Sequence, residues 1–380
     1  MKSILLASAS IVGLTIAGAA SAEVGFAGDA TVGYNDTDGF DTDAQGFYFS
    51  SNVAVTLSTT TDNGLTAAAT FDFDVLDVEE DGDTDGLGLD LSSGGFLLSL
   101  TSEGASMFFG DTAFAAQTYY AGAGDLEADG FSEADGEIVL RGEAMFGSFT
   151  GGFSYVVADV DGNLVGDDAG VDSDFDQLSV GAVGTFGNFT VGMAYQAESD
   201  AVAGGSYDPS ANGDFTMDEI FAIFGSTTVG AADISIAYAS NQTMDTSSTG
   251  VAIAYPFGPV VLGAAFGSNP DGIDTYEVSV GYANGPVTVD VVYADNVDGT
   301  DEEVTLDATY DVGSGVTIMA GMNDGDGTAE TDYYIGGTLA LSDNVSLLAS
   351  YAVDDDQSEE DAIGAPELQE GTTVEMSFTF

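Results

Sequence analysis

Apolar side chains recur at every second position through most of the chain after residue 22. The clearest sets are Phe189, Val191, Met193 and Tyr195; Val287, Val289, Val291 and Tyr293; and Val304, Leu306, Ala308 and Tyr310. Because successive strand side chains point to opposite faces, each segment has one apolar face and one small or polar face. Helical spacing is hard to find, so the pattern predicts an all-β protein.

Two kinds of connection separate these segments, and they alternate along the chain. Short ones carry tight-turn pairs such as Gly187-Asn188 and Asn284-Gly285, since Asn and Gly tolerate positive φ. Long ones, such as residues 159–175 and 199–216, are acidic and rich in glycine. All tight turns therefore lie at one end of the array and all long loops at the other. One opening strand, nine hairpins and a closing strand give about 20 segments.

Aromatic residues mark both ends of the expected strands. Phe186 and Phe189 flank a short turn, whereas Tyr238 and Tyr351 lie where strands enter long loops. In a soluble sandwich the apolar faces meet across a core. In an outer-membrane barrel they face lipid between two aromatic girdles. The girdles and the turn asymmetry favour a transmembrane antiparallel β-barrel with an even number of strands.

The last seven residues support a closed barrel. Residues 374–380 alternate and end on an aromatic residue, and a barrel must pair its last strand with its first. We assign Phe378 and Phe380 as the candidate assembly signal.

The first 22 residues have the pattern of a secretory signal peptide. Lys2 supplies the positive charge, residues 4–17 the apolar stretch, and Ala20-Ser21-Ala22 the cleavage site. Residues 23–380 then form the pore domain. They contain no apolar run of the roughly 18 residues that a spanning helix needs. The absence of cysteine fits an exported protein that is stable without disulfides.

Composition excludes several classes of function. Two basic residues against 65 acidic ones, a net charge of −63, exclude nucleic acid as a partner because phosphate binding depends on Lys and Arg. Without His or Cys there is no Ser-His or Cys-His nucleophile and no zinc site built on these residues. The chain is therefore not expected to be an enzyme, and it requires no cofactor.

The mature chain resembles the general diffusion porins of alphaproteobacteria. The resemblance rests on residues 23–34, 60–65, 107–112 and 185–192 and on terminal Phe380. It implies a homotrimeric outer-membrane barrel of 16 strands whose third loop folds into the lumen as an eyelet, here residues 112–136. The hairpin count of about 20 differs from that number, so 16, 18 and 20 strands all stay open.

The resemblance also assigns a pore constriction. Its candidate residues are Asp111, Asp125, Glu127, Asp129, Glu133, Asp135 and Arg141. Arg141 has two interpretations: a clamp that binds loop carboxylates, or a selectivity residue that faces permeating ions; the clamp is favoured. Related porins place basic residues opposite the acidic loop, but residues 47–57 turn Ser50, Asn52, Ala54 and Thr56 inward and contain no Arg. We therefore expect a channel for small hydrophilic solutes that prefers cations.

Strand parity places further acidic residues toward the lumen. They are Asp72, Asp74, Glu137, Glu143, Glu277, Asp290, Asp307 and Glu375. Acidic residues facing lipid at mid-depth would be costly, which supports the inward orientation.

Calcium is the candidate ion, because clustered carboxylates without Lys or Arg need counter-ions. Asp81, Asp83 and Asp85 match the first half of an EF-hand loop, although position twelve is Ser92. Outer-membrane lipid and lipopolysaccharide, bridged through divalent metal, are the expected surroundings.

Two alternatives remain at this point. One is a substrate-specific channel with Tyr119 and Tyr120 as aromatic contacts in the bore, and the other is a secreted, calcium-stabilised surface β-protein without a pore.

Overall fold

The computed structural model describes most of the chain after Ser21. The described residues are 22–36, 46–78, 92–124, 129–134, 136–159, 162–165, 175–201, 207–209, 215–270, 272, 274–295, 302–324, 331–353 and 363–380, without the side chains of 75–78 and 92–94. The predicted signal peptide (residues 1–22) lies outside this part, apart from Ala22.

The described residues form 20 strands and one short helix. In chain order these are β1 (Glu23–Asn35), β2 (Gly46–Thr60), β3 (Thr66–Val78), β4 (Ser92–Thr101), β5 (Ala105–Gly110), α1 (Ala115–Tyr119), β6 (Ile138–Phe146), β7 (Phe149–Ala158), β8 (Asp176–Phe186), β9 (Phe189–Gln196), β10 (Ile220–Val229), β11 (Ala232–Asn241), β12 (Thr246–Phe257), β13 (Val260–Ser268), β14 (Asp274–Asn284), β15 (Val287–Asp295), β16 (Glu303–Gly313), β17 (Val316–Asp324), β18 (Thr331–Ser342), β19 (Val345–Val353) and β20 (Gly371–Thr379). The prediction of an all-β protein is confirmed.

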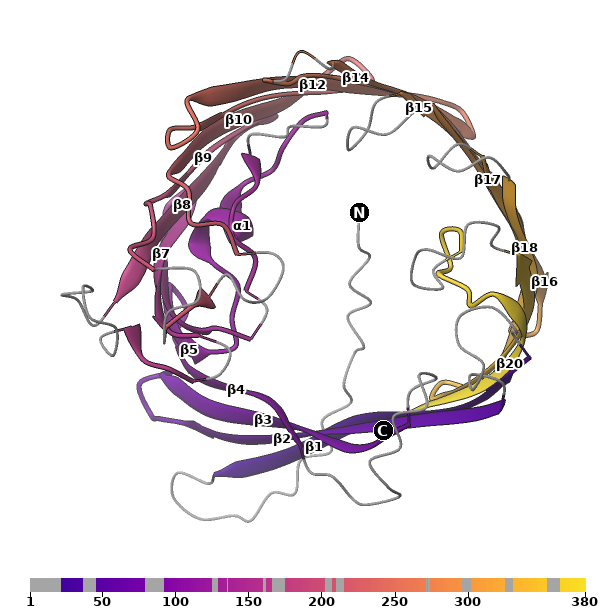
Figure 1. Cartoon of the computed structure of the whole chain (residues 1–380), viewed down its shortest axis with the longest axis horizontal. Helices are drawn as coiled ribbons and strands as arrows, with labels where there is room; N and C mark the ends of the chain where they lie inside the picture. The colour runs from indigo at the N-terminus through magenta and orange to yellow at the C-terminus, as the bar shows by residue number, and fades with distance from the viewer. Residues whose placement is uncertain are drawn as a thin grey trace.

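Each strand pairs antiparallel with its neighbours in sequence, and the sheet closes on itself (Figure 1). The closing ladder joins β1 to β20, with Asp29 opposite Thr379 and Asn35 opposite Thr373. Beyond it, the Phe380 N–H donates to the Gly28 carbonyl at 2.8 Å. Of the strand numbers that stayed open, the count from hairpins is the correct one for the described residues, and the family number of 16 is not.

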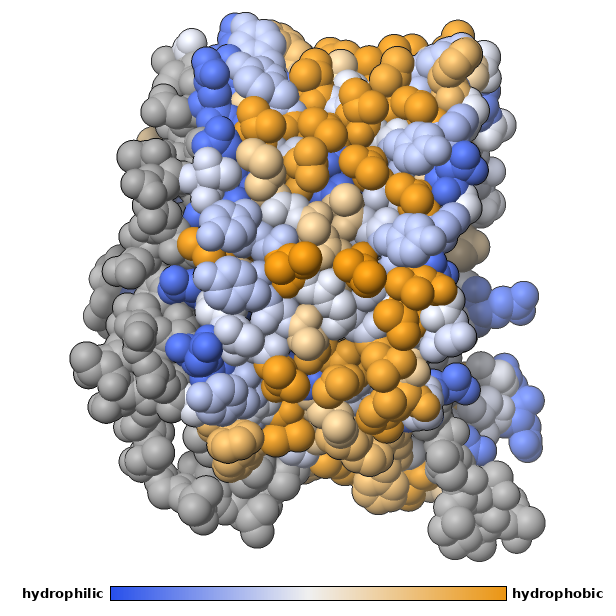
Figure 2. Space-filling view, turned by 90° about the vertical axis from the view of Figure 1, so that its right-hand side faces the viewer, coloured by the Kyte–Doolittle hydropathy of each residue, from blue (hydrophilic) through white to orange (hydrophobic). Residues whose placement is uncertain are grey.

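The apolar positions of the strands lie on the outside of the barrel. Tyr276, Val278 and Val280 of β14 are each about half exposed, and Glu277 and Ser279 between them line a cavity on the opposite face. Figure 2 shows the exterior around β16 to β18, where apolar residues predominate. By the same alternation, Ile318 on β17 points outward and is about half exposed. Since an exposed apolar surface of this extent needs lipid around it, the outward face is the membrane face.

Tight turns and longer connections alternate along most of the chain, as predicted, and the connection between β11 and β12 is the exception. Two-residue turns follow β6, β8 and β10, and the first residue of each turn is a glycine at positive φ: Gly147, Gly187 and Gly230. The connections at the opposite end vary more than the sequence indicated. Only residues 242–245 separate β11 from β12, whereas residues 197–219 separate β9 from β10.

Candidate permeation pathway

The short helix α1 lies inside the ring, against the inner wall formed by β7 and β8 (Figure 1). The first N–H groups of a helix have no partner within it. Here the Ala115 N–H donates to Ser154 Oγ at 2.9 Å, and the Ala116 N–H donates to Ser179 Oγ at 2.8 Å. Both serines are fully buried wall residues. The wall therefore provides the N-terminal caps that the helix lacks.

Apolar contacts extend this attachment on both sides of α1. Before the helix, Phe114 is fully buried in a cluster with Val139, Val156, Val165, Tyr207 and Phe215. After it, Phe131 packs with Ala194, Ile220, Ala222 and Ala239. Ala194, Ala222 and Ala239 are inner-wall positions whose small side chains let the segment approach the strands closely. The largest buried apolar clusters of the described residues thus lie between the wall and this segment.

Arg141 on β6 fastens α1 to the wall. Its Nη1 donates to Thr118 Oγ1 at 2.6 Å and to the Ala113 carbonyl at 3.3 Å, one bond at each end of the helix. The guanidinium carbon lies 4.8 Å from the centre of the Phe108 ring. This geometry supports the clamp. Among the described residues, the loop partners of Arg141 are a hydroxyl and a carbonyl, whereas loop carboxylates were expected.

Tyr119 connects the helix to an acidic residue on the wall. Its hydroxyl donates to Glu143 Oε2 at 2.8 Å. Burial, the hydrogen bond to Glu143 and the charge of that carboxylate raise the pKa of Tyr119 to about 12. Tyr120 packs edge-on against Phe131 and Phe224, with ring centres 5.4 and 5.7 Å away. Tyr119 is buried and Tyr120 is half-buried, and both hold the segment against its neighbours.

The acidic residues assigned to the constriction are only partly described. Asp111 and Glu133 are exposed, and Asp129 is half-buried beside Gly122. Asp125, Glu127 and Asp135 lie outside the described residues. The described acids are thus spread along the segment, from the end of β5 to the return toward β6.

The inner wall carries the acidic residues that strand parity predicted. Asp74 accepts a hydrogen bond from Asn52 Nδ2 at 3.2 Å, and Asp72 lies within electrostatic reach of Asp74 and Asp111. Asp290 is exposed and stands opposite Asp307 in the register of β15 and β16. Glu137 requires a correction. It is completely buried, close to Tyr207 of the connection between β9 and β10, and does not face open lumen.

Three of the wall acids share one arrangement, in which a tyrosine lies over a glycine and bonds to the acid. Tyr48 crosses Gly33 to donate to Glu375 Oε2 at 2.8 Å, and a Cβ on Gly33 would lie 2.1 Å from the Tyr48 ring. Tyr334 crosses Gly321 to reach Asp307 in the same way. Tyr119 reaches Glu143 across Gly152, where a Cβ would lie 3.1 Å from the ring. At Gly33 and Gly321 a Cβ would collide with the ring, so glycine is needed there to admit it.

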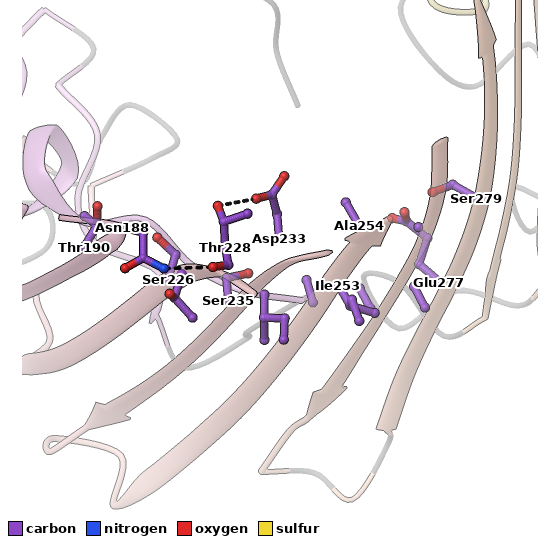
Figure 3. Close-up of a pocket in the computed structure, with 16 residues that line it drawn as sticks. Asn188, Thr190, Ser226, Thr228, Asp233, Ser235, Ile253, Ala254, Glu277 and Ser279 are labelled. Carbon is purple, nitrogen blue, oxygen red and sulfur yellow. Dashed lines mark hydrogen bonds between the residues drawn. The ribbon is translucent and has the colours of Figure 1, made fainter. Parts of the chain in front are cut away.

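A cavity of about 460 Å³ opens on the inner wall of β9 to β14 (Figure 3). Its lining is small and polar: Thr190, Ser226, Ser235, Ala254 and Ser279 contribute, with carboxylates at Asp233 and Glu277. Thr228 Oγ1 donates to Asp233 at 2.6 Å, and both side chains point away from the membrane side (Figure 3). The cavity is a hydrated recess of the lumen, and Asp233 is an acidic residue that sequence reasoning missed because it directly follows a turn.

Sequence reasoning also missed a group of buried acids next to the eyelet segment. Asp176 accepts hydrogen bonds from Ser199 Oγ and from Tyr207 OH, and Asp159 accepts from the Asp208 N–H at 3.2 Å. Burial and the nearby charges of Asp176, Asp159 and Glu137 raise the pKa of the Tyr207 hydroxyl. Because Tyr207 lies in a long loop, the sequence gave no indication of this buried group. These contacts join the connection after β7 to the connection after β9.

Among the described residues no group of three or more acidic side chains is arranged to hold a metal ion. The candidate calcium ligands Asp81, Asp83 and Asp85 lie outside the described residues. The described helix is too short to cross a bilayer, and no other helix in that part of the chain could do so.

A closed barrel with a lipid-facing exterior, a hydrated lumen and a segment docked on its inner wall defines a transmembrane channel protein. The family comparison agrees. Residues 7–359 match the model for the Gram-negative porin family, and the chain belongs to that family. It is accordingly an outer-membrane channel and not an enzyme. The secreted surface protein without a pore is thereby excluded.

Solved structures with the same general architecture include variants of the porin of Rhodopseudomonas blastica. One double-substituted variant is 17% identical, with a TM-score of 0.42, and the match covers 94% of this chain and 100% of that chain. A triple variant is 18% identical, with a TM-score of 0.41 and the same coverage. No curated protein sequence matches the chain significantly.

Proposed function

We propose that the chain forms a passive, cation-preferring diffusion channel for small hydrophilic solutes. The observation that carries this proposal is the engagement of Arg141 in docking α1. It is the single basic residue after Lys2. The described lumen side chains that carry charge are otherwise acidic, among them Asp74, Asp290 and Glu375. A lumen potential of one sign concentrates cations and repels anions.

We also propose a homotrimer, supported by the oligomeric state of homologous porins. Divalent cations, with Ca²⁺ foremost, are proposed to neutralise loop carboxylates, Asp81, Asp83 and Asp85 among them, and to bridge them to lipopolysaccharide phosphates. The support is the charge balance, because a chain with 65 acidic residues and two basic ones needs counter-ions.

The reversal potential across a KCl gradient in a planar bilayer tests the preference. We expect cations to be favoured by at least about tenfold, equivalent to about 1.4 kcal/mol, and the preference to weaken as calcium is added. Combined substitution Asp111→Asn, Asp129→Asn and Glu133→Gln should lower the ratio without changing folding.

The matched control is Asp62→Asn, in the exposed turn between β2 and β3, which should leave the reversal potential unchanged. Preference for chloride would end the proposal. Saturable block by one particular solute would instead favour the substrate-specific channel.

A further inference from the structure

A second segment lies inside the ring, on the side opposite α1. Residues 363–368, between β19 and β20, turn back on themselves within the barrel outline (the yellow segment in Figure 1). The Ile363 N–H donates to the Leu368 carbonyl at 2.9 Å, and the Leu368 N–H donates to the Ile363 carbonyl at 3.1 Å. We call residues 363–368 the inner hairpin. The two reciprocal hydrogen bonds make it a small hairpin of its own.

Two apolar residues, one at each end of the inner hairpin, hold it against the wall. Ile363 and Leu368 are 5% and 4% exposed, and they pack with Met319, Tyr334 and Ala352. The neighbours of these wall residues, Ile318, Tyr333 and Tyr351, are about half exposed on the membrane face. Strand alternation therefore puts Met319, Tyr334 and Ala352 on the lumen face. The hairpin covers the inside of β17 to β19.

A stack of glycine, tyrosine and glycine fixes the height of the hairpin above the wall. The Tyr334 ring lies over Gly321, and Gly364 lies on the ring, where a Cβ would come within 2.2 Å of it. Gly364 has φ of +72°, which favours glycine for a second reason. Asp307 accepts from Tyr334 OH and from the Ala365 N–H at 3.4 Å. One wall carboxylate thus binds both the tyrosine and the hairpin.

The tip of the hairpin stays open to the lumen. Ala365 and Glu367 are exposed, although Ile363 and Leu368 on either side are buried. Around the ring, β18 under the inner hairpin is ten strands from β8 under α1, in a sheet of 20. The two inward segments therefore face each other across the bore, and each is attached to its own wall.

We propose that the inner hairpin is the second half of the constriction. The narrowest aperture lies between it and the eyelet segment, and Glu367 adds a carboxylate to the cation path on the side opposite Asp129 and Glu133. This inference deepens the channel function proposed above. It assigns the size limit to two opposed segments, where the resemblance to porins implied one.

The absence of cysteine allows a direct test. Ala365→Cys places one thiol at the exposed tip, and a bulky, positively charged methanethiosulfonate reagent is added to the open channel. Single-channel conductance should fall about twofold on modification, because the added group stands in the aperture. The matched control is Asp343→Cys, in the exposed turn between β18 and β19 at the opposite end of the barrel, where modification should leave conductance unchanged.

Mass spectrometry of the treated protein shows whether each thiol has reacted. Unchanged conductance after full modification at position 365, or a thiol there that does not react, overturns the proposal. An equal effect at position 343 overturns it as well. A channel that prefers anions, yet is blocked at position 365, would refute cation preference and leave the second half of the constriction in place.

Discussion

Arg141 is positioned to hold a backbone segment against the wall. Its two donated hydrogen bonds go to Thr118 and Ala113, and its planar group lies against Phe108. A guanidinium can make several directed bonds from one plane, which an ammonium cannot. The one basic residue of the described lumen wall therefore has a structural role in docking α1.

Substitutions at position 141 separate these roles. Arg141→Ala should weaken the docking of α1 by about 1.5–3 kcal/mol, the usual range for hydrogen bonds to a charged group, and should increase open-channel current noise. Arg141→Lys retains the charge but loses the planar group that lies against Phe108, so it should be nearly as noisy. A quiet Arg141→Lys channel with native conductance would instead show that charge alone matters.

The tyrosine bonds to wall acids mark a limit of sequence reasoning at this scale. Alternation alone placed Asp307 and Glu375 toward the lumen. It gave no indication that Tyr334 or Tyr48 would bond to them, since Tyr48 and Glu375 lie at opposite ends of the sequence. Those pairings follow from barrel closure and from a glycine between the partners. Neither is visible in a local pattern.

Among the elements, the eyelet segment depends on a wall built to receive it. Many inner positions under it are Ala, Ser or Gly, among them Ala194, Ser154 and Gly181. At Gly181, for example, a Cβ would lie 2.4 Å from the Ala115 carbonyl oxygen. The bounds of β5 and β6 around the segment were predictable from alternation. The role of Phe114 and Phe131 was not, because their partners lie on distant strands and loops.

Enlarging a wall residue under the segment should loosen it. Ala222 is fully buried in the cluster that holds Phe131, so Ala222→Leu should cost about 1–3 kcal/mol by overpacking. We expect faster protease cleavage within residues 112–136 in folded protein. Ala265→Leu is the matched control, because Ala265 lines the open cavity and has room for a larger side chain. Equal cleavage of both variants would contradict the account.

The inner hairpin shows the same limit for another element. Residues 354–371 have the acidic, glycine-containing character of a surface loop, and Ile363 and Leu368 are its only clear apolar signal. Their function depends on Tyr334, Met319 and Ala352, which come from three different strands. Only the assembled wall brings these side chains to one place.

At the scale of the whole molecule, the hairpin pattern of the sequence predicted the number of strands better than the family resemblance did. Turn pairs and alternating segments indicated about 20 strands, and the resemblance implied 16; the described residues form 20. Local chemistry fixes each hairpin, so hairpins can be counted. What the count cannot supply is the content of the lumen, which is set by contacts between distant loops and walls.

The charge of the whole chain should make its stability depend on salt. With a net charge of −63, unscreened repulsion opposes the compact barrel. The unfolding temperature in detergent should rise as ionic strength increases from about 0.01 M to about 1 M, since the screening length falls from about 30 Å to about 3 Å. CaCl₂ should exceed NaCl at equal ionic strength. A flat or falling curve would show that the charges are already neutralised within the fold.

The ladder between β1 and β20 has a consequence for biogenesis. The sheet keeps two open edges until the segment around Asp29 pairs with the segment around Thr379. The contact that forms last is therefore the one that closes the barrel. Contacts between such remote parts of a chain form late and lower the folding rate. Until that moment the intermediate exposes two unpaired strand edges that can pair with other chains.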